Sequence, residues 1–340
     1  MPDDFDSFDD LESFEIEEPI DFNEVMDAFL DDTITFPPRF LYRLSGLEGL
    51  ELEQFIETWP QASQTRRERL LEDLEALAIE TYHLDYDQVF MLGLQETSAH
   101  IRQLAIRALW DCPEGALISR FTDMLLNDPE NDVRAAAARG LGKFIYLAEV
   151  EEIDDAFATT IPNQMIDIFD AAAEGIQRGI IESLGFCSTV DADKHIQSAF
   201  EKDREDWLVS ALVAAGRSAG QYWIPQVIEN LNHEAAEVRL AAVESAGLMG
   251  AQGAMPHLLH LIDDPEEDVK FAAIWSLSEI GGLDARAALE ALLKNTEDED
   301  EIELIGEALE NLNFTEMTLN FDLFDLSEDD LNDMLDDSKI

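Results

Sequence analysis

Lysine and arginine are scarce in this sequence. Its 340 residues include 21 Lys and Arg against 76 Asp and Glu, which gives a net charge of −55 at pH 7. Direct nucleic-acid binding depends on clustered cations that displace counterions from phosphates, so this composition argues against it. A strong field of one sign also repels anionic lipid surfaces and attracts basic proteins. Acidity of this degree can equally be an adaptation to a salty or crowded cytoplasm, and both explanations stay open.

Cysteine, long apolar runs and a leader pattern are also lacking. Two cysteines, Cys112 and Cys187, exclude a disulfide framework and are typical of a reducing compartment. No uncharged apolar run reaches the roughly 18 residues that a membrane-spanning helix needs. The first ten residues, MPDDFDSFDD, are acidic where a secretory signal peptide is basic and then apolar. We therefore expect a cytoplasmic protein that does not enter the membrane.

Familiar catalytic and metal-binding patterns are absent from the sequence. It contains no G-x-S-x-G, no P-loop, no G-x-G-x-x-G and no Cys–His cluster. His257 and His260 have helical i, i+3 spacing and could share an ion with Asp263, but the sequence supplies no further ligand at fixed geometry. We therefore expect no catalytic residue, no cofactor and no metal site.

The sequence does contain a short motif that is present in seven copies. Its clearest copy lies within DDPEEDVKFAAIWSLSEIGG, residues 263–282. The first large apolar residue of each copy serves as an anchor, and the anchors are Ile101, Val133, Ile176, Trp207, Val238, Val269 and Ile302. Successive anchors are 32, 43, 31, 31, 31 and 33 residues apart. A nearly constant period of this length is the signature of a helical repeat architecture.

Each copy predicts a pair of helices. After Val269, apolar and small residues recur at helical spacing, and the preceding segment AMPHLLHLI has Pro256 where a first helical turn accepts proline. Gly281 and Gly282 can reverse the chain by adopting positive φ. The acidic DDPEED turn ends one helix at Pro265 and places carboxylates at the start of the next. These acids therefore need no ligand to explain them.

Helix–turn–helix units of about 31 residues with Asp-Val-Arg at the second helix, as at 132–134, resemble HEAT repeats of the short type found in phycobilin-lyase-like proteins. The resemblance covers roughly residues 83–312 and implies an all-α solenoid of about seven helix pairs. It says little about function, because such repeats occur in enzymes and scaffolds alike. The basic residue after the anchor is expected to bond acids of its own or an adjacent turn. This residue is present as Arg102, Arg134, Arg239 and Lys270.

Two enzyme families with this architecture can be compared with the chain. Deoxyhypusine hydroxylases bind a di-iron centre through several His-Glu pairs, whereas this chain has one such pair, His233-Glu234. That activity is therefore not expected. Phycobilin lyases lack a universal catalytic signature, so a repeat-based enzyme resembling them stays open as the alternative function.

The remaining segments complete the predicted domain organisation. We expect an acidic disordered tail over 1–35, a helical N-terminal cap over 36–82, the repeats over 83–312 and an acidic, aromatic tail over 313–340. The basic cluster Arg66, Arg67 and Arg69 is expected to meet acids of its own chain. An insertion of about 12 residues, placed within 147–164, is expected to lengthen a helix or to form a projecting loop.

The function that we expect is a non-enzymatic protein–protein interaction scaffold or adaptor. Second helices of the repeats would line a concave surface, and the negative field would steer a basic protein onto it, for example a ribosomal or other nucleic-acid-binding protein. The predicted contact residues are surface acids of the second helices and aromatics of the C-terminal tail. They are Glu182, Glu244, Glu279, Phe321 and Phe324.

Overall fold

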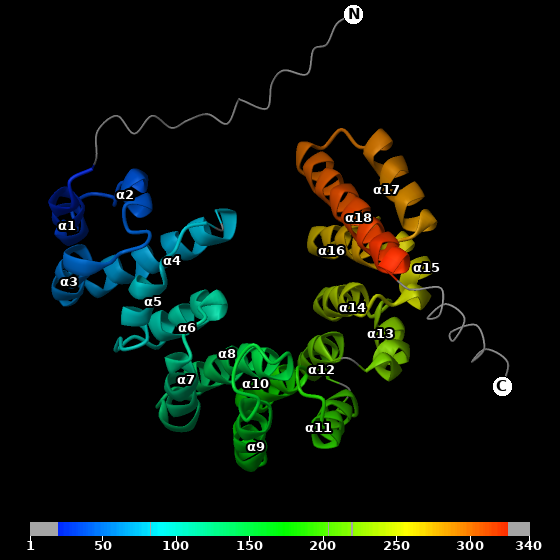
Figure 1. The fold of residues 1–340 in the computed structure, drawn as a ribbon, viewed down its shortest axis with the longest axis horizontal. Helices are drawn as coiled ribbons and strands as arrows, with labels where there is room; N and C mark the ends of the chain where they lie inside the picture. The colour runs from blue at the N-terminus through cyan, green and yellow to red at the C-terminus, as the bar shows by residue number, and fades with distance from the viewer. Residues whose placement is uncertain (1–19, 82, 203, 219, 326–340) are drawn as a thin grey trace, which may run out of the picture. The chain divides into compact units, whose positions relative to one another are not determined.

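The computed structural model describes residues 20–81, 83–202, 204–218 and 220–325, with side chains described as far as Phe314 except that of Glu80. Every regular element in these ranges is helical. The chain divides into two compact units, with the boundary between Glu114 and Gly115. In the second unit helices follow one another in pairs, as the sequence predicts for the repeats (Figure 1).

The first unit contains six α-helices and two short 3₁₀ helices among its described residues. They are α1 (Phe22–Leu30), α2 (Pro38–Tyr42), α3 (Gly49–Thr58), η1 (Trp59–Gln61), α4 (Gln64–Glu80), α5 (Asp87–Gly93), α6 (Ala99–Ala108) and η2 (Leu109–Asp111). Phe29 is fully buried at its centre, with its ring centroid 5.5 Å from that of Phe55 and 5.8 Å from that of Trp59. These stacked rings form the core of its N-terminal part.

Helix α1 lies inside the segment 1–35 that the sequence analysis assigned to a disordered tail. The Asp21 carboxylate caps this helix by accepting a hydrogen bond from the backbone N–H of Asn23. Phe22, Val25 and Phe29 follow at helical spacing and are buried. Over residues 22–30 the structure therefore differs from the expected tail, because these aromatics form the buried stripe of an amphipathic helix.

Two members of the basic cluster meet acids of their own chain, as expected from the sequence: Arg66 lies 3.7 Å from the Asp32 carboxylate, and Arg67 pairs with Glu96. Arg66 donates to the backbone carbonyls of Asp31 and Ile34, the latter at 2.7 Å. The Nε of Arg67 lies 2.7 Å from a carboxylate oxygen of Glu96, and both side chains are largely buried. These contacts tie α4 to the segment after α1 and to the turn before α6.

The second unit contains the remaining helices. They are α7 (Ala116–Asn127), α8 (Asn131–Glu149), α9 (Phe157–Phe169), α10 (Glu174–Leu184), α11 (Val190–Phe200), α12 (Glu205–Arg217), η3 (Gln221–Trp223), α13 (Ile224–Asn230), α14 (Ala236–Leu248), η4 (Gln252–Ala254), α15 (Met255–Leu261), α16 (Glu267–Ile280), α17 (Leu283–Asn295) and α18 (Glu299–Asp325). The even-numbered helices from α8 to α18 are the second helices of the pairs, and each packs on the next. They line the inner side of this unit, whereas α9, α11, α13, α15 and α17 lie outside them (Figure 1).

Glycine and serine bring neighbouring second helices close together. A Cβ atom added to Gly247 of α14 would lie 2.7 Å from the Ser276 hydroxyl oxygen of α16. That hydroxyl donates to the Val243 carbonyl of α14 at 3.0 Å. The same close approach recurs along the unit, and the residue pairs are Gly142 with Ser183, Gly185 with Ala214, Gly216 with Ser245, and Gly247 with Ser276. Three of these pairs contain a serine, and we refer to them as the glycine–serine contacts: Gly142 with Ser183, Gly216 with Ser245, and Gly247 with Ser276.

Six of the seven predicted anchors are buried at the start of a second helix. Ile101, Val133, Ile176, Trp207, Val238 and Val269 are 0 or 1 % exposed. The seventh anchor, Ile302, is not buried: it is 41 % exposed, and Ile305 of the same helix is fully buried instead. Acidic neighbours occupy the whole first turn of α18, so its buried stripe begins one turn later.

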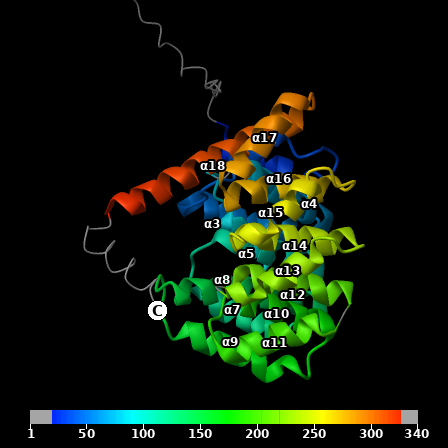
Figure 2. The same ribbon diagram turned by 90° about the vertical axis from the view of Figure 1, so that its right-hand side faces the viewer.

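The last helix of the repeat array is longer than the sequence predicts, and the insertion takes both of the forms that the sequence allowed. Helix α18 continues to Asp325, past residue 313 where the expected tail begins, and it is visibly longer than the other helices in the stack (Figure 2). The insertion both lengthens α8 and forms a loop before α9, in which Glu151 has a φ of 61°. Both forms anticipated for the insertion are therefore present.

The basic residues after the anchors hold the turns together. Asp264 of the DDPEED turn accepts from Arg239 of the preceding repeat at 2.8 Å, through both carboxylate oxygens. Lys270 pairs with Glu301 of the following repeat. Arg134 instead donates to the Leu125 carbonyl at 2.8 Å. The expected bonds to turn acids are thus present between repeats for Arg239 and Lys270.

Candidate binding groove on the second helices

One of the predicted contact acids is not a surface residue. Glu182 of α10 is 9 % exposed and forms two bonds with Arg139 of α8, at 2.5 and 3.1 Å. Its carboxylate also accepts from the Ser210 hydroxyl of α12 at 2.8 Å. Glu182 therefore joins three successive second helices, and its prediction as an exposed partner-binding acid is wrong. A sequence shows that the residue is on a helix but not that Arg139 lies opposite it.

Opposite charges alternate along the inner face from α8 to α14. Arg217 of α12 follows Glu182 and donates to its backbone carbonyl at 3.0 Å. Burial lowers the pKa of Arg217, while the nearby carboxylates of Glu182 and Glu244 oppose that shift. The order is thus Arg139, Glu182, Arg217 and Glu244. The next charged residue along this face, Glu279 of α16, has the same sign as Glu244.

Glu244 and Glu279 line one open groove between α14 and α16. Its volume is about 570 Å³, and its remaining lining residues are Leu240, Leu248, Asp268, Phe271, Ala272, Trp275 and Ser276. Leu248 is 63 % and Trp275 is 38 % exposed, so a broad apolar surface faces solvent. The groove thus combines three carboxylates with an apolar, aromatic floor, and no Lys, Arg or His is among its lining residues.

The negative charges of Glu244 and Glu279 are only partly compensated by neighbouring groups. Burial among apolar groups raises the pKa of Glu244, and the charge of Arg217 only partly opposes this. Burial also raises the pKa of Glu279; a hydrogen bond with Trp275 opposes the shift and the charge of Glu244 adds to it. Each carboxylate would therefore be stabilised in its charged form by an incoming cation.

Sequence reasoning found these two glutamates but missed the aromatic and apolar side chains beside them. Trp275 stands six residues after the anchor Val269, where Glu244 stands after Val238. Leu248 and Glu279 likewise share the position ten residues after their anchors. Aligning the repeats could therefore have identified Trp275 and Leu248, because the positions six and ten residues after the anchor line the groove in both copies.

The predicted tail aromatics cannot be placed beside the groove. The backbone of Phe321 and Phe324 belongs to the last turns of α18, and their side chains lie outside the described residues. The rest of the expected tail, residues 326–340, also lies outside the described part of the chain.

The cysteines and two of the histidines that the sequence analysis considered for chemistry are buried or contact neighbouring groups of the chain. Cys112 and Cys187 are buried and are not joined in a disulfide. The Nδ1 atom of His233 accepts from the Ala235 backbone N–H at 3.1 Å, which shapes the turn before α14. His257 lies 3.1 Å from the Asn232 side chain. None of the helices in the described ranges is long and apolar enough to span a membrane.

These features define the class of the protein, which is an α-solenoid repeat protein whose second helices form an inner layer. Models of HEAT repeats match residues 117–147 and 224–310. The chain therefore contains HEAT repeats, as its sequence period predicts. The second match includes both helices of the groove.

Solved structures with similar folds are known, although no curated protein matches the sequence. The complex of CpcE and CpcF of phycocyanin lyase from Nostoc sp. PCC7120 matches with 16% identity and a TM-score of 0.44, over 66% of this chain and 94% of that one. YibA of E. coli matches with 16% identity and a TM-score of 0.41, over 82% and 97% of the two chains. Human deoxyhypusine hydroxylase matches with 15% identity and a TM-score of 0.34, over 86% and 96%. Similarities this low carry no information about activity.

Proposed function

We propose that this protein is a non-enzymatic interaction scaffold whose α14/α16 groove binds a basic segment of a partner protein. The observation that supports the proposal is the placement of Glu244 and Glu279 in one groove with Trp275, which is 38 % exposed. A Lys or Arg side chain can lie over an indole ring while its charge meets a carboxylate. Leu248 offers apolar surface to the aliphatic part of the same side chain.

The overall charge supports the same kind of partner. A net charge of −55 accelerates the encounter with cationic proteins and repels nucleic acid and anionic membranes. A ribosomal protein or another nucleic-acid-binding protein, whose basic surface is exposed before it meets its nucleic acid, has the required chemistry.

The test compares neutralised acids in the groove with neutralised acids elsewhere. A fluorescently labelled Lys/Arg-rich peptide is titrated with the full-length chain, its E244Q/E279Q variant and an E229Q/E290Q variant, and anisotropy is measured. Glu229 and Glu290 are exposed on the first helices α13 and α17, so both variants lose the same charge. We expect E244Q/E279Q to weaken binding at least about tenfold, as loss of charged contacts at a binding centre does.

A W275A variant and a salt series complete the design. W275A is expected to weaken binding without changing the charge, and the affinity of the unmodified chain should fall steeply between low and physiological salt. Equal affinities of the two double variants would contradict the groove proposal. If the full-length chain captures no basic protein from lysate even at low salt, the scaffold proposal in its electrostatic form fails as well.

A further inference from the structure

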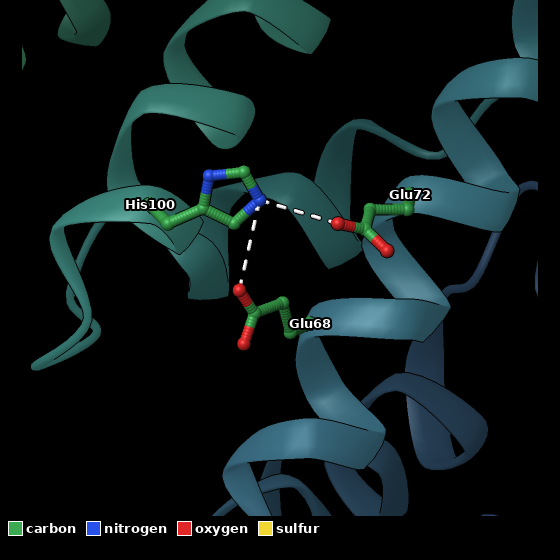
Figure 3. A group of neighbouring side chains, drawn as sticks. All are labelled: Glu68, Glu72 and His100. Carbon is green, nitrogen blue, oxygen red and sulfur yellow. Dashed lines mark hydrogen bonds and ion pairs between the residues drawn. The ribbon is translucent and has the colours of Figure 1, made fainter.

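A second feature of the molecule lies in the first unit, far along the chain from the groove. Glu68 and Glu72 are one turn apart on α4, and His100 is in the first turn of α6. Figure 3 shows the three side chains pointing toward one another across the two helices. The His100 Nε2 atom lies 3.2 Å from Glu72 Oε1 and 3.6 Å from Glu68 Oε1.

The distances between these side-chain atoms are close to the separation between two ligand atoms on one metal ion. Zn²⁺ binds nitrogen and carboxylate oxygen at about 2.0–2.2 Å, so tetrahedral ligands are separated by about 3.4 Å. The two measured separations lie on either side of that value, and the three ligand atoms all lie within 4.8 Å of one another. Within the described residues, no other group of three His, Cys, Asp or Glu converges in this way.

Buried neighbours fix the positions of the three ligands. Leu71 precedes Glu72 and Ile101 follows His100, and both are fully buried. A Cβ added at Gly93 would lie 3.0 Å from Leu71 and 3.6 Å from Ile101, so the two helices are held together over this glycine. The Ser98 hydroxyl caps α6 by accepting from the Ile101 backbone N–H. The ligands therefore project from packed helices, which suits a preformed site.

The next contact along the same two helices has a different character. Glu75 is bound by Arg107 through two bonds, at 2.5 and 2.6 Å. Arg107 thus neutralises the charge of Glu75. Glu68 and Glu72 instead face the imidazole nitrogen of His100. The His100 side chain is 55 % exposed, so an ion has direct access from solvent.

We infer that Glu68, Glu72 and His100 bind one divalent transition-metal ion of the Zn²⁺ type. Three protein ligands leave a fourth position for water or for a donor from a partner. A mixed nitrogen and oxygen set favours Zn²⁺ over Mg²⁺ or Ca²⁺, which prefer oxygen alone. The inference does not depend on the α14/α16 groove. It also concerns a different cluster from His257 and His260, the pair to which the sequence pointed.

The test is a calorimetric Zn²⁺ titration of chelator-treated full-length protein in excess Mg²⁺. The Mg²⁺ occupies ordinary carboxylate sites, which a chain of this acidity has in number. We expect one Zn²⁺ site per chain, and an affinity at least about tenfold lower in H100A and in E68Q/E72Q. H257A and E303Q/E307Q are the controls; the latter removes an exposed i, i+4 glutamate pair from α18, and both should bind as the unmodified chain does.

A second measurement guards against variants that merely unfold. Far-UV circular dichroism and thermal melts establish that H100A and the conservative variant H100Q are folded. Co²⁺ added to the unmodified chain should give visible absorption bands of a four-coordinate ion, and these bands should be lost in H100Q. Zn²⁺ binding that is unchanged in H100A, equally weakened in H257A, or abolished by Mg²⁺ overturns the inference. The three residues would then form only a hydrogen-bonded cluster.

Discussion

Gly185, the C-cap residue of α10, lies directly against the backbone of Ala214 in α12. A Cβ atom at position 185 would be 2.5 Å from the Ala214 carbonyl oxygen and 2.7 Å from its Cα. Contacts this short cannot be relieved by rotating a side chain, because the obstacle is main chain. The two helices therefore require glycine at this position to pack as they do.

Substitution G185A should destabilise the fold although alanine favours helix. Alanine gains up to about 1 kcal/mol of helix propensity, but separating two packed helices costs about 1–3 kcal/mol. The control is G306A on α18, where a Cβ meets no atom within 4 Å. Urea midpoints should fall for G185A and stay equal or rise for G306A. Equal midpoints in the two variants would show that α10 and α12 can move apart freely.

Removing Asp264 should weaken the link between two repeats. The Asp264 and Arg239 side chains are 5 and 12 % exposed, and D264A leaves the guanidinium without its carboxylate. We expect a loss of about 2 kcal/mol of unfolding free energy at pH 7, the magnitude of hydrogen bonds between charged groups. D191A, which breaks the exposed pair of Asp191 with Lys194, should change stability little.

The pH dependence of that loss follows from the pKa of Asp264. Burial raises this pKa, but hydrogen bonds from Arg239 and Glu266 outweigh burial, so the pKa lies below its ordinary value of 3.8. A carboxyl with a lowered folded-state pKa contributes stability above the unfolded pKa and loses it as pH falls through the folded pKa. The difference between D264A and the unmodified chain should therefore be full at pH 7 and shrink below pH 3.8. A difference that grows on acidification would contradict this sign.

Glu279→Gln should have the opposite effect on stability. Because the folded-state pKa of Glu279 is raised above 4.5, folding is favoured while this carboxyl is protonated, and that contribution is lost as pH rises through the folded pKa. E279Q should therefore melt at a higher temperature than the unmodified chain at pH 7.5, and the two should converge below pH 4.5. E290Q removes one exposed acid from α17 and corrects for the lower net charge. A melting temperature that rises no more in E279Q than in E290Q would show that Glu279 is already well compensated.

Both cysteines should be unreactive in the folded protein. Desolvation raises the pKa of Cys112 to about 12 and also raises the pKa of Cys187. Since the thiolate is the reactive form, a thiol reagent at pH 8 should modify the native chain slowly and the urea-unfolded chain rapidly, with two equivalents in the latter. If one equivalent of the reagent reacted rapidly with the native protein, one cysteine would be an accessible thiolate, which would contradict this prediction.

The repeat period predicted the fold well because burial is encoded locally. Small and apolar residues at helical spacing mark each second helix, and six anchors lie in the core as expected. The prediction failed for Ile302, where the acidic first turn of α18 displaces the buried stripe. It also failed for α1, because acidic composition concealed the helical spacing of Phe22, Val25 and Phe29.

The candidate sites depend on partners that one repeat does not contain. Glu182 and Glu244 occupy equivalent positions six residues after their anchors, yet one is buried by Arg139 and the other faces a groove. Likewise, Glu68 and His100 are 32 residues apart, which is one repeat period. Only the packing of separate helices, α8 on α10 and α4 on α6, brings such residues together.

The glycine–serine contacts have a consequence for how the groove could evolve. The distance between α14 and α16 is held by Gly247 and Ser276 together with the hydrogen bond to the Val243 carbonyl. Leu248, which is exposed in the groove, has no part in that hydrogen bond. The spacing of the two helices therefore depends on Gly247 and Ser276, whereas an exposed lining residue such as Leu248 can be replaced while both of these stay in place. If the groove binds a partner as proposed, substitutions at Leu248 would change the surface offered to that partner without removing the contact that sets the helix spacing.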